Sequence, residues 1–180
     1  LYALDYLNKK LLWAHNYKIP FRSNLKIVDN KIILSDQNNS ILIVNKKTGV
    51  KLRTLPTEEK TLKNEFINSF ALIDNKILFL NTFGTIYALD RKNLKINWFL
   101  NLNQSLDLNL NNLFYANSIV SDNKNVVISS IPFLYILDSN TGTTISREPI
   151  TSISKPIITK QGLFLITPDN LLVYKDLQKQ

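Results

Sequence analysis

The sequence predicts an all-β fold, a β-propeller built from four-stranded antiparallel blades, and three observations support this prediction. An apolar strand that ends in Asp or Asn, with the form Leu-Tyr-Ala-Leu-Asp in its first copy, starts at residues 1, 41, 86 and 134, and a shorter copy starts at 171. Every copy after the first follows a tight polar turn at a nearly constant offset of ten or eleven residues. The copies are 37 to 48 residues apart, and four short strands per period are typical of a propeller.

The repeats divide the chain into five predicted blade parts within a single domain over residues 1–180. The first part supplies two strands, the next three are complete, and the last supplies three strands; these parts are residues 1–18, 24–55, 67–102, 116–148 and 154–175. Together they amount to about four blades, and propellers close a ring with about four to eight. Because the sequence begins inside a motif and contains no methionine, we expect a partial propeller and a C-terminal fragment.

The turn residues of each repeat suit β-hairpins. Pairs such as Asp29-Asn30 and Asp74-Asn75 separate two apolar runs, where a two-residue turn needs residues that tolerate positive φ. Asp5, Asp90 and Asp138 recur at equivalent places after the third strand, so we expect each to close a hairpin by an Asx-type turn. A residue that is repeated from blade to blade has a structural role there, whereas catalysis needs one asymmetric constellation.

Trp13 and Trp98 lie on the fourth strands of two repeats, and we expect them to pack between neighbouring blades because each offers a large apolar face. Arg53 and Ser146 stand at the equivalent position in two other repeats.

Composition argues against several classes of function. The net charge is +8, but the lysines fall mostly at predicted hairpin tips and no run of five basic residues occurs, so we expect no nucleic-acid partner. The absence of cysteine excludes disulfides and thiolate metal sites. The sequence contains no stretch of about eighteen apolar residues, so we expect no membrane-spanning helix.

Candidate catalytic groups are few. His15 is the only histidine, and without a nearby carboxylate in sequence we interpret it as a half-exposed strand residue rather than a base. Glu58, Glu59 and Glu65 could form a carboxylate site, but a solvated loop is the simpler interpretation. We therefore predict no catalytic, cofactor-binding or metal-binding residue, and no cofactor.

The connection between two blades, residues 101–115, alternates leucine with polar residues. Long loops between elements often carry function, and exposed leucines on a loop mark a protein contact more often than a small-molecule site. A partner surface and an ordinary packed connection are both compatible with this pattern.

The motifs Tyr2-Ala3-Leu4-Asp5 with Trp13, and Tyr87-Ala88-Leu89-Asp90 with Trp98, resemble the tryptophan-docking repeat of the pyrroloquinoline-quinone (PQQ) type propellers. That repeat has the pattern Tyr-Ala-Leu-Asp-x-x-Thr-Gly-x-x-x-Trp, and its Thr-Gly pair is kept at Thr48-Gly49 and Thr141-Gly142. The resemblance implies the propeller fold. It leaves function open, because the repeat serves both quinone enzymes and non-catalytic scaffolds.

Within these propellers the chain is most similar to the BamB family of outer-membrane assembly lipoproteins. A Ser-Leu-Ser-Leu-Arg loop of that family, after the tryptophan of a central blade, contributes to binding the β-barrel assembly protein. Here Ser105, Leu106, Leu108 and Asn109 follow Trp98 at a similar distance, with Asn109 in place of the arginine.

The resemblance therefore implies a non-catalytic scaffold that binds a protein partner at the periplasmic face of the outer membrane, with an upstream lipid anchor. A fragment of a PQQ-dependent alcohol dehydrogenase is the alternative. It would need a calcium-ligating set, a catalytic aspartate and, commonly, a vicinal cysteine pair, and the sequence has no cysteine and no recognisable ligand set. A generic interaction module is a third possibility.

Overall fold

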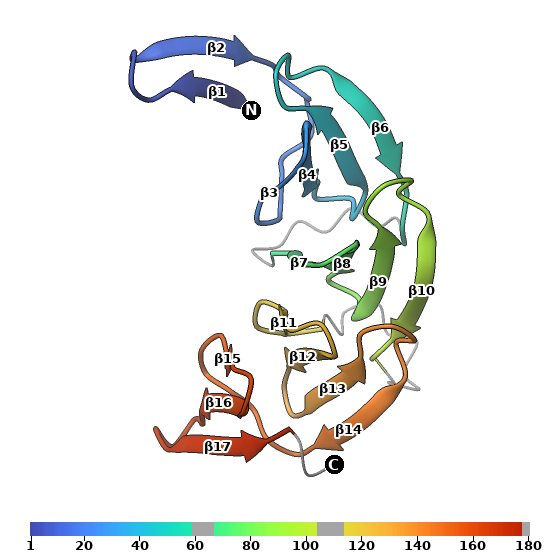
Figure 1. Cartoon of the computed structure of the whole chain (residues 1–180), viewed down its shortest axis with the longest axis vertical. Coiled ribbons are helices and arrows are strands. Elements are labelled where there is room, and N and C mark those ends of the chain that lie inside the picture. The colour runs from blue at the N-terminus through green and yellow to red at the C-terminus, as the bar shows by residue number, and fades with distance from the viewer. Residues whose placement is uncertain (59–66, 104–113, 178–180) are drawn as a thin grey trace. The chain divides into compact units, whose positions relative to one another are not determined.

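A computed structural model describes residues 1–58, 67–103 and 114–177, which form seventeen β-strands and no helix. No helix that could cross a membrane is found in this part of the chain. The strands make five antiparallel sheets in which neighbours in sequence are neighbours in space (Figure 1). This confirms the predicted fold class of four-stranded antiparallel blades.

The chain divides into two compact units, residues 1–68 and 69–180, and the single domain predicted over residues 1–180 stays a prediction. The first unit contains a two-stranded sheet and a four-stranded sheet. Their strands are β1 (Tyr2–Asp5) and β2 (Lys10–Ala14), then β3 (Lys26–Val28), β4 (Lys31–Ser35), β5 (Ile41–Asn45) and β6 (Lys51–Leu55).

The second unit contains two four-stranded sheets and one of three strands. The four-stranded sheets are β7 (Ser69–Ile73), β8 (Lys76–Leu80), β9 (Thr85–Asp90) and β10 (Ile96–Asn101), then β11 (Val120–Ser121), β12 (Asn125–Ser129), β13 (Leu134–Asp138) and β14 (Thr144–Glu148). The last sheet is β15 (Ile157–Ile158), β16 (Gly162–Ile166) and β17 (Leu172–Asp176).

The three complete sheets have a buried interior and an exposed outer strand. In the complete sheets the second and third strands are almost entirely buried, whereas the fourth strands β6, β10 and β14 are mostly exposed. The inner strands are apolar at successive positions because both faces are covered.

Apolar side chains join neighbouring sheets face to face within each unit. In the first unit Trp13 packs with side chains of β4 and β5, such as Ile32 and Val44. In the second unit one cluster joins the β7–β10 and β11–β14 sheets, and another joins the latter to the β15–β17 sheet. The innermost strand β11 contacts both β7 and β15. These features are those expected of successive propeller blades.

Candidate functional site

The hairpin between the third and fourth strands has the same construction in four repeats. The Oδ1 atom of its first residue accepts hydrogen bonds from the backbone N–H groups two and three positions later, at 2.8 to 3.1 Å. That residue is Asp5, Asn45, Asp90 or Asp138. These are Asx turns, so the recurring carboxylates are engaged in the backbone of their own loops.

Hydrogen bonding also sets the ionisation of two of these groups. Hydrogen bonds from the Asn8 side chain and backbone lower the pKa of Asp5, and those from Thr141 lower the pKa of Asp138. A lowered pKa keeps the carboxylate charged, which is the form that accepts these bonds.

The residue four positions after each Asx residue adopts positive φ. It is Lys9 (50°), Gly49 (72°), Leu94 (60°) and Gly142 (74°) in the four hairpins. Glycine adopts this conformation without steric cost, whereas lysine and leucine adopt it under strain. Glycine is therefore favoured by the backbone at all four places but occurs at only two.

The two tryptophans explain why glycine occurs at positions 49 and 142. The ring of Trp13 lies on Gly49, and the ring of Trp98 lies on Gly142, so that a Cβ atom added to either glycine would come within 2.4 Å of the ring. Trp13 Nε1 donates to the Lys46 carbonyl at 3.0 Å, and Trp98 Nε1 donates to the Ser139 carbonyl at 3.2 Å. Each tryptophan therefore docks on the hairpin of the following repeat, which must lack a side chain at that point.

A β-bulge precedes the docked residue. The pairing between third and fourth strands shifts at Leu12, Leu52, Asn97 and Ile145, which come directly before Trp13, Arg53, Trp98 and Ser146. A bulge bends the strand and re-aims the next side chain. The sequence analysis missed both the bulge and the pairing of tryptophan with glycine. Both could have been sought in the co-occurrence of Trp in one repeat with Thr-Gly in the next.

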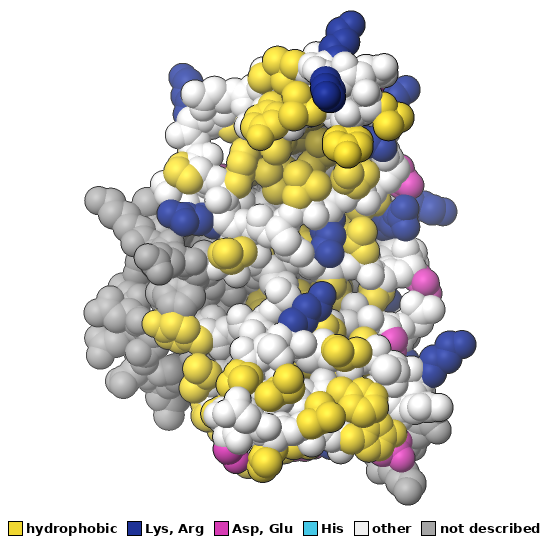
Figure 2. Space-filling view, turned by 90° about the vertical axis from the view of Figure 1, so that its left-hand side faces the viewer, with side chains coloured by type: hydrophobic (Ala, Val, Ile, Leu, Met, Phe, Trp, Pro, Cys, Tyr) yellow, Lys and Arg dark blue, Asp and Glu magenta, His cyan; other side chains and the backbone are white. Residues whose placement is uncertain are grey.

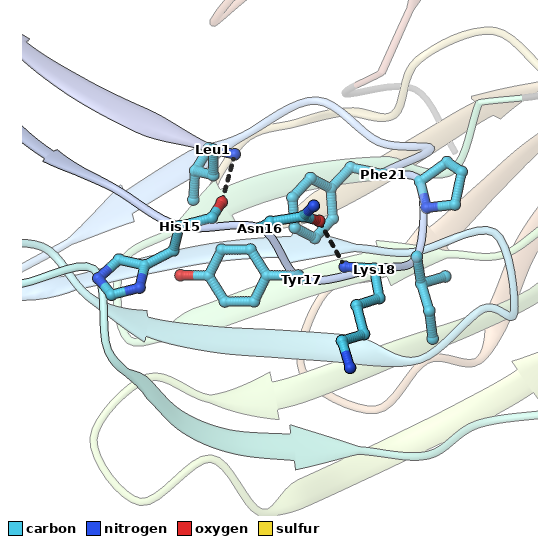
Figure 3. A pocket seen from close by; sticks show the side chains of 8 residues that line it. Leu1, His15, Asn16, Tyr17, Lys18 and Phe21 are labelled. Atoms are coloured by element: carbon cyan, nitrogen blue, oxygen red, sulfur yellow. Dashed lines mark hydrogen bonds between the residues drawn. The ribbon is translucent and has the colours of Figure 1, made fainter.

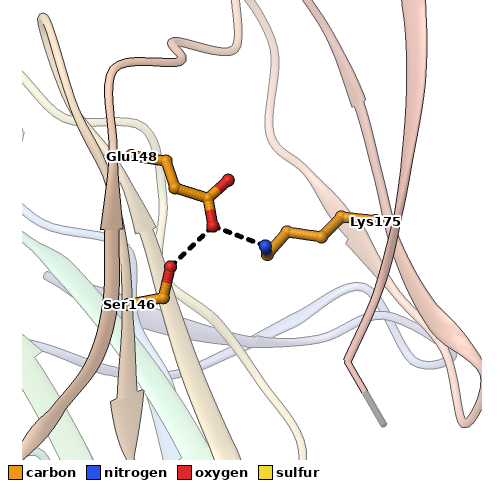
Figure 4. A network of polar contacts seen from close by, with 3 residues as sticks. All are labelled: Ser146, Glu148 and Lys175. Carbon is orange, nitrogen blue, oxygen red and sulfur yellow. Dashed lines mark hydrogen bonds and ion pairs between the residues drawn. The ribbon is translucent and has the colours of Figure 1, made fainter. Parts of the chain in front are cut away.

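Polar groups join β14 and β17 (Figure 4). Ser146 stands at the tryptophan position of its repeat, and its hydroxyl donates to Glu148 Oε1 at 2.6 Å. Lys175 Nζ donates to the same oxygen at 2.5 Å. The hydrogen bond from Lys175, followed by that from Ser146, lowers the pKa of Glu148.

The predicted partner-binding residues Ser105, Leu106, Leu108 and Asn109 lie outside the described residues. The chain on either side of them is well anchored. Leu102 N donates to the Gly84 carbonyl at 2.8 Å, and Phe114 N donates to the Thr82 carbonyl at 2.9 Å. Both flanks are thus held by the same β8–β9 turn.

Gly84 has a packing role in this anchor. Its φ is +84°, and an added Cβ would come within 2.7 Å of the Phe114 ring. Leu102 is buried, and its carbonyl accepts a hydrogen bond from the Tyr135 hydroxyl. The segment that carries the four predicted residues is therefore tied to a rigid part of the sheet at both ends.

One pocket lies in the first unit, with a volume of about 390 Å³ (Figure 3). It is lined by Leu1 and residues 15–21. His15 is exposed, and its Nε2 lies 3.0 Å from the Thr48 carbonyl. The Tyr17 hydroxyl donates to the Gly49 carbonyl, and burial raises the pKa of this phenol. His15 Nε2 and the Tyr17 hydroxyl thus both contact the hairpin on which Trp13 docks. The residues that line the pocket include no carboxylate side chain.

Of the three glutamates considered as a carboxylate site, the structure describes one. Glu58 is exposed, while Glu59 and Glu65 lie outside the described residues. Among the residues that the structure describes, no three His, Cys, Asp or Glu side chains converge as metal ligands would. On the face shown in Figure 2, Lys and Arg side chains are spread rather than gathered in one patch.

Comparison with known proteins gives one family and several solved structures. The sequence profile described as outer membrane protein assembly factor BamB matches residues 1–180. No curated protein sequence matches the chain. The crystal structure of BamB from Moraxella catarrhalis is similar at a TM-score of 0.68 and 14% identity, over 94% of this chain and 50% of that one.

Two computationally designed proteins are also similar in structure. Ika4 has a TM-score of 0.66 and 12% identity over 89% of this chain and 93% of its own, and Ika8 has 0.65 and 13% over 87% and 46%. At these identities the similarity concerns the fold. This chain spans about half the length of the Moraxella BamB structure.

Proposed function

The chain belongs to the family of the outer membrane protein assembly factor BamB, and from this premise we propose that it is a non-catalytic β-propeller scaffold. In this proposal it binds protein partners through the segments between blades, at the periplasmic face of the outer membrane. The proposed partner is the β-barrel assembly protein of that membrane.

The observation that carries the proposal is the structural use of the repeated polar residues. Asp5, Asp90 and Asp138 each bind backbone N–H groups of their own turn, and the two tryptophan N–H groups bind carbonyls of the next hairpin. The repeated polar residues therefore stabilise the hairpins and the contacts between neighbouring sheets. This leaves the non-repeated connections as the places where a specific contact can be made.

The segment containing Leu106 and Leu108 is the connection best suited to this role. Its flanks, Leu102 and Phe114, are both hydrogen-bonded to the β8–β9 turn. An apolar pair in a connection between blades can bury its surface against a partner protein.

A pull-down of the assembly protein tests this function. We expect the double variant Leu106→Asp plus Leu108→Asp to lose capture, because it places two charges in an apolar contact. The matched control is Leu171→Asp plus Leu172→Asp, which adds the same charges at two exposed leucines elsewhere and should capture normally. Unchanged capture by the Leu106/Leu108 variant would contradict the proposal.

The quinone-dependent dehydrogenase is the competing function. Its site would need carboxylate and amide ligands for calcium, and no three His, Cys, Asp or Glu side chains of the described residues lie together. The chain also has no cysteine for the vicinal pair. Dye-linked alcohol oxidation after addition of quinone and calcium to the protein would favour this alternative. So would loss of that oxidation when an aspartate of the protein is replaced.

A further inference from the structure

Among the strands of residues 1–58, 67–103 and 114–177, the outer strands β2, β6, β10 and β14 each pair with a neighbour on one side only. The free side of an edge strand presents unpaired N–H and C=O groups, which can pair with another chain. Natural sheets discourage this pairing with charged side chains, lysine above all.

Only one of these four strands lacks such charges. Lys10 begins β2, Lys51 and Arg53 lie on β6, and Arg147 and Glu148 lie on β14. In contrast β10, Ile-Asn-Trp-Phe-Leu-Asn, has no charged residue and is one residue longer than the other three. All four strands contain the bulge described above, so the bulge does not set β10 apart.

β10 carries an exposed aromatic side chain on one face of its sheet. Phe99 is 68% exposed, and its ring stacks on Tyr87 with 6.0 Å between centroids. Tyr87 stacks in turn on Phe79, and Phe79 packs against Phe70. One ring from each strand thus forms a row across the sheet, with three buried rings supporting the exposed one. Rigid, exposed aromatic residues are typical anchors of protein interfaces.

We propose that β10 is a docking edge that takes an extended strand of another protein by β-augmentation, a strand with an uncharged centre and acidic residues at one end, with Phe99 as the side-chain anchor. Main-chain hydrogen bonds would run from residues 98–101, the regular part of β10 beyond the bulge. This inference deepens the proposed scaffold function, on which it rests only for the existence of a protein partner.

Charge indicates what kind of strand fits. Lys92 and Lys95 are exposed in and after the β9–β10 turn, at one end of the edge. The partner strand should therefore carry acidic residues at the end that lies beside this turn. A second copy of this chain is a poor occupant, because each copy has a formal charge of +8 and would repel the other.

Fluorescence anisotropy with a synthetic peptide tests the docking edge on the full chain. The probe alternates threonine and valine and has two glutamates at each end, so that either strand direction can be used. We expect saturable binding that Phe99→Lys weakens by about tenfold or more, because the charge blocks the edge. Phe99→Thr removes the same ring but keeps a neutral edge, and should weaken binding less.

Two further comparisons separate strand pairing from other contacts. An N-methylated residue cannot donate a main-chain hydrogen bond to the edge, so a probe N-methylated at every threonine and valine should not bind, whereas the unmethylated probe should. Leu52→Lys makes a comparable change on β6, whose edge is already charged, and should leave affinity unchanged.

The outcomes that overturn the inference are distinct. Equal binding of the unmethylated and the fully N-methylated probes would exclude strand pairing, and equal loss in Leu52→Lys and Phe99→Lys would indicate a general charge effect. Sedimentation showing a dimer that Phe99→Lys dissociates would make a second copy the occupant. The Leu106→Asp plus Leu108→Asp variant should still bind the probe, so that failure of the loop contact and failure of the edge can be told apart.

Discussion

Two neighbouring interfaces in residues 69–180 are built in different ways. Between the β7–β10 and β11–β14 sheets, Trp98 docks on Gly142 beside a large apolar cluster. Between the β11–β14 and β15–β17 sheets, Ser146 replaces tryptophan, the apolar cluster is smaller, and Lys175 pairs with Glu148.

These two interfaces show that the repeat motif connects neighbouring repeats, because a residue of one repeat packs on the hairpin of the next. Each of the two tryptophans, Trp13 and Trp98, lies on a glycine of the next repeat, because a side chain there would meet its ring. Where the tryptophan is missing, a polar contact on the outer strands takes its place. Polar contacts near the surface contribute less than apolar burial, so we expect the second interface to be the weaker one.

The largest expected effect is that of Trp98→Ala. Removing the partly buried ring leaves a cavity over Gly142 and frees the Ser139 carbonyl, and should lower the free energy of unfolding by about 3 kcal/mol. Urea unfolding followed by fluorescence or circular dichroism measures this. Phe99→Ala, which removes an exposed ring from the same strand, is the control and should cost clearly less. Equal costs would mean that docking adds nothing.

Gly142→Ala should have the next largest effect. The methyl group would meet Trp98 Cε3 at 2.4 Å, and alanine at a φ of +74° is strained, so we expect a loss of about 2 kcal/mol. Gly49→Ala places the same methyl group under Trp13 and should behave alike. The same urea titration compares both variants, and a loss below about 0.5 kcal/mol in both would contradict the described contact.

Glu148→Gln should cost at most about 1 kcal/mol, because the side chains of Glu148 and Lys175 are 29% and 23% exposed and water screens the pair. The pKa of Glu148 is lowered in the folded state, so its contribution is present above the ordinary glutamate pKa and is lost as pH falls through the folded value. Wild type and variant should therefore converge in stability in acid. Asp169→Asn, which removes an exposed carboxylate, is the control.

Hydrogen exchange of backbone amides should show that the interface between the β11–β14 and β15–β17 sheets is the weaker one. Amides of β16 should exchange faster than those of β12, and Glu148→Gln should speed β16 selectively. A uniform change across both sheets would show that the pair does not act at this interface.

Lys9→Gly should have the smallest effect and the opposite sign. Lys9 holds the positive φ that glycine holds in the docked hairpins, and no large apolar contact is lost with its exposed side chain. Relief of strain outweighs the added flexibility of the unfolded chain, so we expect a gain of about 0.5 kcal/mol. Thermal unfolding detects it. Destabilisation would show that the lysine side chain has a role of its own.

The sequence predicted much of this architecture because its signals are local. Apolar runs, the Asx residues and their regular offsets define strands and hairpins within each repeat. The contact of Trp98 with Gly142 was not predicted, because it joins residues that are distant in the chain. The bulge before Trp98 was not predicted either, because the apolar pattern does not show a one-residue shift in pairing. Edge exposure at Phe99 was missed for a similar reason, since only the strand order shows that β10 has a free side.

The candidate site was also predicted only in part from the sequence. Leu106 and Leu108 were found from a resemblance and stay a prediction, whereas their anchors Leu102 and Phe114 emerge only from the structure. Gly84 holds a positive φ in its turn, and its contact with Phe114 gives it a second role.

A double-mutant cycle between Trp98 and Gly142 tests the central claim most directly. Our account predicts strong coupling: Gly142→Ala should cost about 2 kcal/mol in the wild type but only about 1 kcal/mol with Trp98→Ala, where backbone strain alone remains. Equal costs in both backgrounds, within about 0.3 kcal/mol, would contradict the account that tryptophan of one repeat docks on the glycine of the next.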